Sequence, residues 1–295
     1  MAAPGTVRIG ISGWTYKPWR GVFYPEDLTQ KRELEHASNT FNSIEINGTF
    51  YSLQRPASFE RWAAETPDEF VFSVKAPRFI THIRRLKDVQ APVANFLASG
   101  LFRLGAKLGP ILWQLPPNFK FKPELIEEFF KLLPHDTEQA AALARKHDKW
   151  VTGRSVLKSD AMRPMRHAME IRHASFATPE FVNLLKTYDV ALVCADTVEW
   201  PRLMDVTSDF VYCRLHGSEV LYASGYDEES LDQWAKRVGV WAHGGEPEDA
   251  ERVIKESGPE RSSRDVFVYF DNDAKVRAPF DAKSLTQRVK KLLAR

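Results

Sequence analysis

Arg214 and His216 occupy alternate positions in the segment Phe210–Gly217, FVYCRLHG. In a β-strand alternate side chains share a face, so the guanidinium and the imidazole lie together at the C-terminal end of this strand. Histidine suits proton transfer because its ordinary pKa lies near neutrality. A buried arginine needs a partner, since an unpaired buried charge is strongly destabilising. The spacing therefore predicts acid–base chemistry beside a buried ion pair.

Polar side chains end five further segments that have the composition of strands. In each segment they alternate with apolar residues and therefore share a face. In a closed barrel that face points into the lumen, and barrel enzymes keep their active sites at the top of the lumen. We therefore expect a polar cup at this end of the barrel. Its members are Glu45, Asn47, Lys75, Glu170, Arg172, Asp196, Arg214, His216 and Asp271.

Eight segments would have to position these side chains. They are Val7–Trp14, Ser43–Asn47, Phe70–Lys75, Lys107–Leu115, Arg166–Arg172, Val190–Asp196, Phe210–Gly217 and Asp265–Phe270. Helical periods separate most of them, which is typical of a parallel sheet. The pattern predicts an α/β fold, a single (β/α)8 TIM barrel of eight parallel strands that forms one domain over residues 1–295, with its ordered core at 7–293. A doubly wound open sheet is the alternative, because the link Thr197–Asp209 has no helical period.

The stretch between the fourth and fifth strands is the least regular part of the chain. Over Pro134–Pro164 we expect an irregular insertion that consists of a polar helix around Thr137–Lys146 and then a loop.

Composition narrows the class of protein. The chain has 295 residues, 43% of them hydrophobic, and a formal net charge of +2, which does not by itself indicate nucleic-acid binding. There is no apolar run long enough to cross a bilayer, and the start, MAAPGTVRIG, does not resemble a secretory signal. Cys194 and Cys213 both lie inside strands, where we expect them to be buried and reduced. These features indicate a cytoplasmic protein with no membrane partner.

A metal centre is open but not favoured, and no metal ligand is assigned. The carboxylates of the cup and His216 offer oxygen and nitrogen ligands for a divalent ion. However, the chain has no HxH or HExxH spacing, and Lys75, Arg172 and Arg214 would repel a cation. The Walker, GxGxxG, GxSxG and CxxC motifs are also missing from the sequence, so the cofactor remains unknown.

Two sets of loop residues could contribute to binding. The segment Arg78–Lys87 is basic and contains His82, so it is either an anion gate or a solvated turn. Trp14, Tyr16 and Tyr51 lie in loops after the first two strands. They either stack on a base or sugar ring or pack their loops onto the barrel.

Seven motifs, in order, carry a family likeness. They are GISGWTYKPWRGVFYP, FNSIEINGTFY, FVFSVKAPRFITH, LGPILWQLPPNF, AMEIRHASF, VYCRLHG and VYFDND. From about Val7 to the C-terminal helix, the chain resembles the YecE-like family, a domain of unknown function. The resemblance implies a TIM barrel and no settled activity. A departure lies at Phe176, which stands where a tryptophan is expected.

The resemblance implies functional positions. They are Gly13, Trp14, Glu45, Asn47, Lys75, His82, Gln114, Glu170, Arg172, Arg214, His216, Gly217 and Asn272.

Together with the residue pattern, these positions support three hypotheses. The first is an enzyme, of hydrolase, lyase or isomerase type, for a small anionic or polyhydroxylated substrate similar to a phosphosugar or a nucleotide. In it, His216 is the general acid or base, Glu45 or Glu170 is its partner, and Lys75, Arg172 and Arg214 stabilise negative charge. The second is a nucleic-acid-binding protein or nuclease. The third is a barrel in which the cup is only a structural plug; the oligomeric state stays open.

The candidate site residues fall into two groups. The catalytic candidates are His216, Glu45, Glu170, Lys75 and Asp271. The substrate-binding candidates are Trp14, Tyr16, Asn47, Tyr51, His82, Gln114, Arg172, Arg214 and Asn272.

Overall fold

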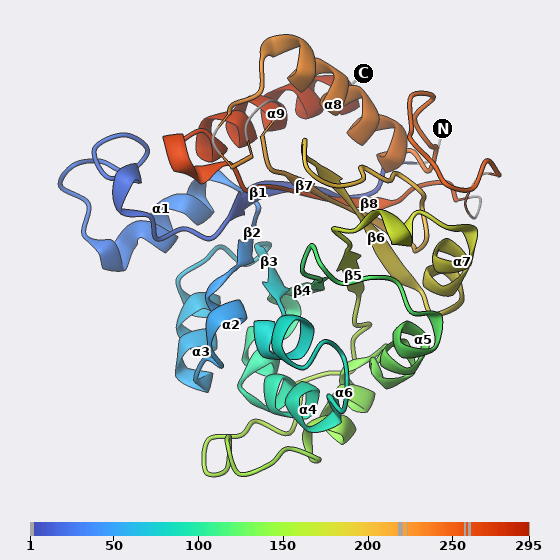
Figure 1. The fold of residues 1–295 in the computed structure, drawn as a ribbon. Helices are drawn as coiled ribbons and strands as arrows, with labels where there is room; N and C mark the ends of the chain where they lie inside the picture. Colours follow the sequence, from blue (N-terminus) through green and yellow to red (C-terminus); the bar gives the residue numbers. More distant parts are fainter. Residues whose placement is uncertain (1–2, 218–220, 223, 257, 259–260, 295) are drawn as a thin grey trace.

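Eight parallel strands close into a barrel in the order β1 to β8. The computed structural model describes residues 3–217, 221–222, 224–256, 258 and 261–294. Each strand pairs in parallel with the next, and β8 pairs with β1 to complete the ring (Figure 1). The predicted TIM barrel is therefore confirmed, and the alternative of an open sheet is wrong.

The strands begin and end close to the predicted positions. They are β1 (Val7–Ser12), β2 (Ser43–Ile46), β3 (Val71–Lys75), β4 (Leu108–Gln114), β5 (His167–Glu170), β6 (Val190–Asp196), β7 (Phe210–Leu215) and β8 (Asp265–Phe270). Several strands are shorter at their C-terminal ends than predicted. As a result, Asn47, Arg172 and His216 lie just beyond the strands, at the rim, as Asp271 does after β8.

Helices cover the outside of the ring. They are α1 (Glu33–Thr40), α2 (Gly48–Tyr51), α3 (Pro56–Ala64), α4 (Gln90–Ala98), α5 (Pro123–Leu132), α6 (Thr137–Ala144), α7 (Pro179–Thr187), α8 (Glu228–Ala242) and α9 (Ala278–Leu293). Helices α8 and α9 pack against each other outside β1 and β8 (Figure 1). As the sequence predicts, no helix lies between β6 and β7, and all residues of that link are described.

Short helical turns add detail at the rim. They are the 3₁₀ turns η1 (Lys17–Trp19), η2 (Gln30–Arg32), η4 (Leu101–Lys107), η5 (Ala174–Phe176) and η6 (Asp273–Lys275), and the π-helix η3 (Phe79–Ile83). The basic segment after β3, predicted as a loop, therefore begins with a π-helical turn. Such turns are often found at functional sites.

The irregular insertion between β4 and β5 is confirmed. Helix α6 begins at Asp136, whose carboxylate accepts hydrogen bonds from the backbone N–H groups of Glu138 and Gln139 at 2.9 and 2.7 Å. This cap satisfies N–H groups that have no partner within the helix. The helix packs against α4, and an irregular segment follows it to β5.

A layer of tyrosine and apolar side chains fills the middle of the lumen. Its members are Leu112, Ala168, Ala191, Val193, Phe210, Tyr212, Phe267 and Tyr269. The hydroxyl of Tyr212 lies 2.7 Å from Ser73 Oγ, and that of Tyr269 lies 2.6 Å from Ser43 Oγ. Because these polar tips find partners inside the barrel, the layer forms a packed floor beneath the rim.

Strand β6 turns the opposite face toward the lumen from the one expected. Ala191 and Val193 face the lumen, so Cys194 and Asp196 face the helices, and Asp196 does not belong to the cup. Its carboxylate instead bonds Arg202 Nη1 at 2.9 Å. Strand β6 is buried on both faces, so its sequence shows no alternation that could set the register. Cys194 and Cys213 are free and buried, as predicted.

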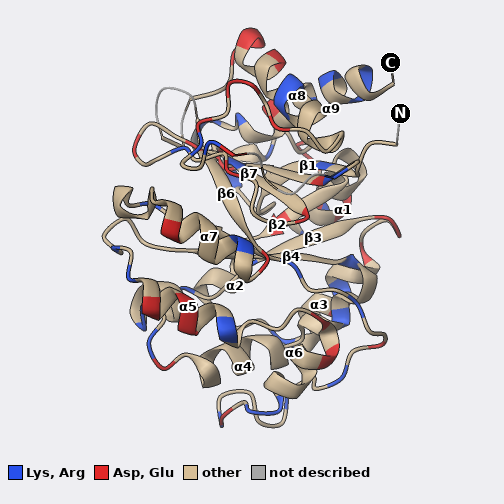
Figure 2. Cartoon of the chain, turned by 90° about the vertical axis from the view of Figure 1, so that its right-hand side faces the viewer, with Lys and Arg blue, Asp and Glu red and all other residues tan. Residues whose placement is uncertain are grey.

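The surface carries charges of both signs. Figure 2 shows acidic and basic positions interspersed over the helices, in keeping with a net charge of +2. Among the helices of the described residues, none is both long and apolar enough to cross a membrane.

Candidate functional site

The guanidinium of Arg214 is the centre of the cup. This side chain is fully buried in the lumen at the end of β7. Its Nη1 donates to Glu170 Oε2 at 2.7 Å, and its Nη2 donates to Glu45 Oε1 at 2.9 Å and to Asp271 Oδ2 at 2.7 Å. One cation therefore holds three carboxylates that come from β2, β5 and the end of β8.

Glu45 is the most completely bonded of these carboxylates. Its Oε2 accepts from the hydroxyl of Tyr212 at 2.6 Å and from Arg214 Nε at 3.1 Å. Its Oε1 accepts from the hydroxyl of Ser12 as well as from Arg214. With four donors around it and no exposure to solvent, Glu45 joins the floor to the cup and has no lone pair left for a substrate.

Glu170 holds two cations together. Its Oε1 accepts from Arg172 Nε at 2.6 Å, while its Oε2 accepts from Arg214. Burial opposes its charge, but Arg172 and Arg214 hold the pKa of Glu170 well below its ordinary value. The other side of the Arg172 guanidinium lies 4.1 Å from the centre of the Trp200 ring. Arg172 is thus fixed at the rim in a cation–π contact.

His216 lies between two carboxylates. Its Nδ1 is 3.2 Å from Asp271 Oδ2, and its Nε2 is 3.8 Å from Glu170 Oε1. Neither contact has the alignment of a hydrogen bond, and both ring nitrogens are buried without a hydrogen-bond partner in the described part of the chain. Burial lowers the pKa of His216 even though Asp271 and Glu170 favour the charged form. The imidazole is therefore disposed to be neutral.

Arg172 and Arg214 form ion pairs with carboxylates of the cup. Among the described residues, Lys75 has no carboxylate at ion-pair distance. Its Nζ lies 4.3 Å from the centre of the Phe50 ring, and 8% of the residue is exposed. Burial, followed by repulsion from Arg214, lowers the pKa of Lys75 to about 8. An ammonium in this state has N–H groups to offer to an anion.

Two acidic residues after β8 have pKa values that are shifted in opposite directions. Arg214 and His216 overcome the effect of burial and hold the pKa of Asp271 well below its ordinary value. Burial and the charge of Asp271 raise the pKa of Asp273 to about 8. Among the described residues, no hydrogen bond is made to Asp273 Oδ1, which is buried. Neighbouring carboxyls with separated pKa values are a common arrangement for an acid and a base.

Three further predicted residues line the same rim. Tyr16 donates its hydroxyl to Ser12 O at 2.6 Å, and Asn47 Oδ1 is buried without a partner in the part of the chain that is described. Burial, followed by the charges of Lys75, Arg172 and Arg78, lowers the pKa of His82 to about 4. Tyr16, Asn47 and His82 therefore border the cup.

The remaining predicted residues divide between the rim and other surroundings. Gln114 is buried at the end of β4, and its Cα pairs with that of Glu170 across the ladder. The amide of Asn272 donates to Asp281 Oδ2 at 2.8 Å and so ties the rim to α9. Trp14 packs on Trp62 of α3, with ring centres 5.4 Å apart, outside the lumen.

Tyr51 is 72% exposed and lines a separate pocket on the outer rim.

The cup does not have the arrangement of a metal centre. No group of three or more His, Cys, Asp and Glu side chains within the described ranges is placed to hold a metal ion. The physical reason is that Arg214 occupies the oxygens of Glu45, Glu170 and Asp271 that would otherwise face a cation.

Four residues of the site were missed from the sequence. Ser12 and Tyr212 bond Glu45, Trp200 covers Arg172, and Asp273 adds a second carboxyl. Tyr212 shares the parity of Arg214, which is a signal that the sequence does contain. Trp200 and Asp273 follow strand ends in irregular segments, where no periodicity reports which way a side chain points.

Comparisons with known proteins agree on one family. A family model described as "Protein of unknown function DUF72" matches residues 8–294. The chain is 29% identical to the UPF0759 protein YunF of Bacillus subtilis, over 95% of this chain and 94% of that protein. It is 31% identical to the UPF0759 protein YecE of Escherichia coli K12, over 38% of this chain and 39% of that protein.

Solved structures show the same fold. A DUF72 family protein of Thermotoga maritima superposes with a TM-score of 0.70 at 24% identity, covering 98% of this chain and 100% of that one. One from Enterococcus faecalis superposes with a TM-score of 0.67 at 15% identity, covering 97% and 96%.

Replacing the central cation tests its structural role. We expect Arg214→Met to lower the free energy of unfolding by about 3–5 kcal/mol, because three carboxylates are left buried without their partner. Arg32→Met is the control: Arg32 pairs with Glu35 on the exposed surface, so its loss should leave the free energy of unfolding nearly unchanged. Urea denaturation at pH 7 compares the two variants. Equal stability of both would contradict this account of the cup.

The two acidic residues after β8 predict opposite effects of pH on stability. Folded Asp273 keeps its proton from about pH 4, where the unfolded chain loses it, up to about pH 8. The residue therefore costs stability as pH rises through that window, by up to about 1.4 kcal/mol per unit. Asp273→Asn should match the wild type at pH 4 and exceed it at pH 9.

Asp271 provides the matched comparison. Its folded pKa is lowered, so its stabilising effect is present above the ordinary pKa and is lost as pH falls through the folded value. Asp271→Asn should be less stable than the wild type at pH 7 and approach it in acid. Urea midpoints at pH 2, 4, 7 and 9 measure both variants, and parallel profiles for the two would refute the separation of the pKa values.

Proposed function

The chain belongs to the DUF72 family of proteins of unknown function, and we propose that it is an enzyme that acts on a small anionic or polyhydroxylated substrate bound in the cup. The reaction would proceed by proton transfer at His216. Lys75 and Arg172 would stabilise the negative charge of the substrate or of the transition state. Hydrolase, lyase and isomerase chemistry all use these elements.

The observation that carries this proposal is the division of the cup into two tiers. In the lower tier, Arg214 and Glu45 bond each other, and Glu45 also accepts a hydrogen bond from Tyr212 of the floor. In the upper tier, His216 Nε2, Asn47 Oδ1 and Asp273 Oδ1 are buried without hydrogen-bond partners among the described residues. A structural plug would be expected to pair its buried polar atoms, since each unpaired one is costly. The upper tier is instead built for a ligand that supplies the partners.

The geometry suggests a role for each residue. Asp271 Oδ2 is the carboxylate oxygen at 3.2 Å from a ring nitrogen of His216, so Asp271 would orient the imidazole with its proton on Nδ1. Nε2 is then free to act as the base. Asp273, protonated up to about pH 8, would be the acid. Of the two partners expected for His216, Glu45 is occupied by its four donors, and Glu170 holds Arg172 and Arg214 and lies 3.8 Å from Nε2. Asp271 takes that role in the proposal instead.

Nucleic-acid binding is the second candidate function. A groove of about 420 Å³ between the segment after β3 and the loop after β4 is lined by cations, which suits phosphate groups. Its basic residues are Arg84, Arg85, Lys87, Lys120 and Lys122. Two of these are already engaged: Arg84 pairs with Asp88, and Arg85 donates to Asn118. The interspersed charges elsewhere on the surface favour the small-molecule hypothesis (Figure 2).

Anion binding at Lys75 has a predicted pH profile. Sulfate keeps its charge of −2 over the range used, so a loss of affinity reports the protein. We expect the affinity for sulfate to be level below about pH 7 and to fall toward tenfold per pH unit above about pH 8, as Lys75 loses its proton.

Calorimetric titrations from pH 6 to 10 measure this affinity. In Lys75→Arg the charge persists, so the decline should be shallower, and any remainder reports the ionisation of Asp273. Identical profiles for the two proteins would show that Lys75 does not hold the anion.

A substrate screen tests the enzyme hypothesis directly. Phosphosugars, nucleotides and a single-stranded oligonucleotide are assayed for turnover and binding. His216→Ala should lower kcat/KM on any active compound by about 100-fold or more, because it removes the base. His135→Ala, an exposed histidine outside the cup, should have no effect.

The same screen separates the three hypotheses. Turnover that His216→Ala leaves unchanged would place the chemistry outside the cup. Oligonucleotide binding that falls steeply between 50 and 300 mM salt, without small-molecule turnover, would support the nucleic-acid candidate instead. No binding of any compound would leave the cup as a plug.

A further inference from the structure

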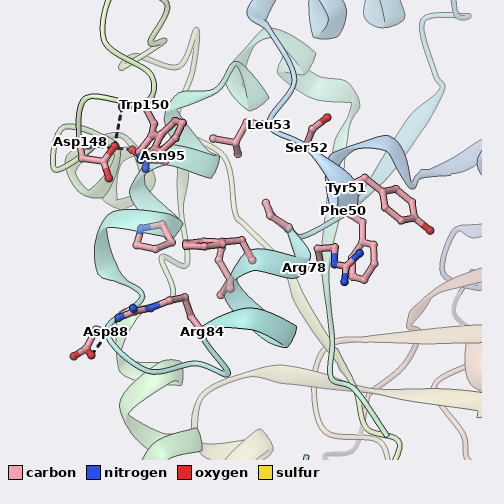
Figure 3. A pocket seen from close by; sticks show the side chains of 14 residues that line it. Phe50, Tyr51, Ser52, Leu53, Arg78, Arg84, Asp88, Asn95, Asp148 and Trp150 are labelled. Carbon is pink, nitrogen blue, oxygen red and sulfur yellow. Dashed lines mark hydrogen bonds and ion pairs between the residues drawn. The ribbon is translucent and has the colours of Figure 1, made fainter.

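A pocket of about 530 Å³ opens on the outer rim, beside the cup. It lies between α2, the segment that begins with η3, α4 and the irregular part of the insertion (Figure 3). This volume is within the range of small-molecule sites. Neither the catalytic roles proposed above nor the packing of the barrel uses it.

Exposed aromatic side chains form its walls. Tyr51, Phe79 and Trp150 line the pocket and are 72%, 50% and 70% exposed, respectively. Grouped aromatic surface of this kind usually marks a binding site rather than a packing defect.

The Trp150 wall is held in place. The carboxylate of Asp148 accepts from the backbone N–H of Trp150 at 2.9 Å, and Asn95 of α4 accepts from the backbone N–H of Asp148 at 3.0 Å. Figure 3 shows Trp150 beside Asn95 and Asp148, at the opposite end of the pocket from Phe50 and Tyr51. These bonds fix the backbone that carries Trp150 at the far end of the pocket.

Phe50 connects this slot to the cup. Its ring lines the pocket, yet it also lies 4.3 Å from Lys75 Nζ and 5.1 Å from the ring of His82. Arg78 lies beside Phe50 in the pocket wall (Figure 3), and its charge contributes to the lowered pKa of His82. Among the described residues, Arg78 has no ion-pair or hydrogen-bond partner. Two unpaired cations therefore stand where the pocket meets the cup.

We infer that this pocket binds a planar aromatic ring of the substrate, whose anionic group extends past Phe50 to Arg78 and Lys75. Aromatic walls recognise the face of a ring, and the two cations recognise its charge. An acyl chain would not need this combination. The inference rests on the proposed function, because it names the class of substrate: an aromatic ring that carries a phosphate or carboxylate.

Three probes test the two halves of this inference by calorimetry. Adenosine 5′-monophosphate carries ring and anion, ribose 5-phosphate only the anion, and adenosine only the ring. We expect the monophosphate to bind about tenfold or more tightly than ribose 5-phosphate. Trp150→Ala should remove that advantage and leave ribose 5-phosphate binding unchanged. Met162→Ala, an equally exposed apolar residue of the insertion that does not line the pocket, should change neither.

The possible failures are distinguishable. Equal affinity for the monophosphate and ribose 5-phosphate, or an unchanged advantage in Trp150→Ala, would overturn the ring site and leave the cup untouched. If ribose 5-phosphate does not bind while adenosine binds in a Trp150-dependent way, the pocket stands, and the proposed anion site of the cup is what fails. Binding of a single-stranded oligonucleotide but of none of the three probes would assign the aromatic walls to nucleic acid.

Discussion

A full positive charge at the centre of a barrel sets the conditions for everything around it. Arg214 is fully buried, and such a charge is tolerated only if carboxylates surround it closely. Glu45, Glu170 and Asp271 meet that need from three different parts of the ring. Each contact with the guanidinium depends on the register of the strand that carries the carboxylate. The ion cluster thus links the closure of the fold to the electrostatics of its upper end.

Together with burial, the same charge shifts the pKa values of its neighbours. Arg214 adds to the effect of burial in lowering the pKa of Lys75 to about 8. Asp271, ionised against Arg214, helps raise the pKa of Asp273. The lower tier has its hydrogen-bonding groups paired. Above it, Lys75 and Asp273 have pKa values of about 8. The cup can have both a structural and a proposed functional role, because the first belongs to the lower tier and the second to the upper tier.

Much of the fold follows from the sequence because strands impose a period of two. The positions of Glu45, Lys75, Glu170, Arg214 and Asp271 on lumenal faces were all correctly predicted in this way. The method failed where alternation was missing. Strand β6 is apolar on both faces, so the polarity of its last residue alone predicts a lumenal Asp196, which in fact faces the helices and bonds Arg202.

Residues beyond the strand ends were harder to place. Trp14 lies on the helical layer against Trp62, and Asn272 points to α9. Loop direction depends on tertiary contacts that no local period records. For the same reason the rim pocket could not be predicted, since it joins Tyr51 to Trp150, which are about 100 positions apart in the chain.

The floor of tyrosines and apolar side chains limits how a small molecule could enter and leave the cup. Leu112, Tyr212 and Tyr269 fill the lumen below the ion cluster, so a molecule could reach the cup only from the rim. Any molecule that enters must depart through the opening by which it arrived. A second reactant would have to enter from the same side as the first. A released product would then compete with the next substrate molecule for that entrance.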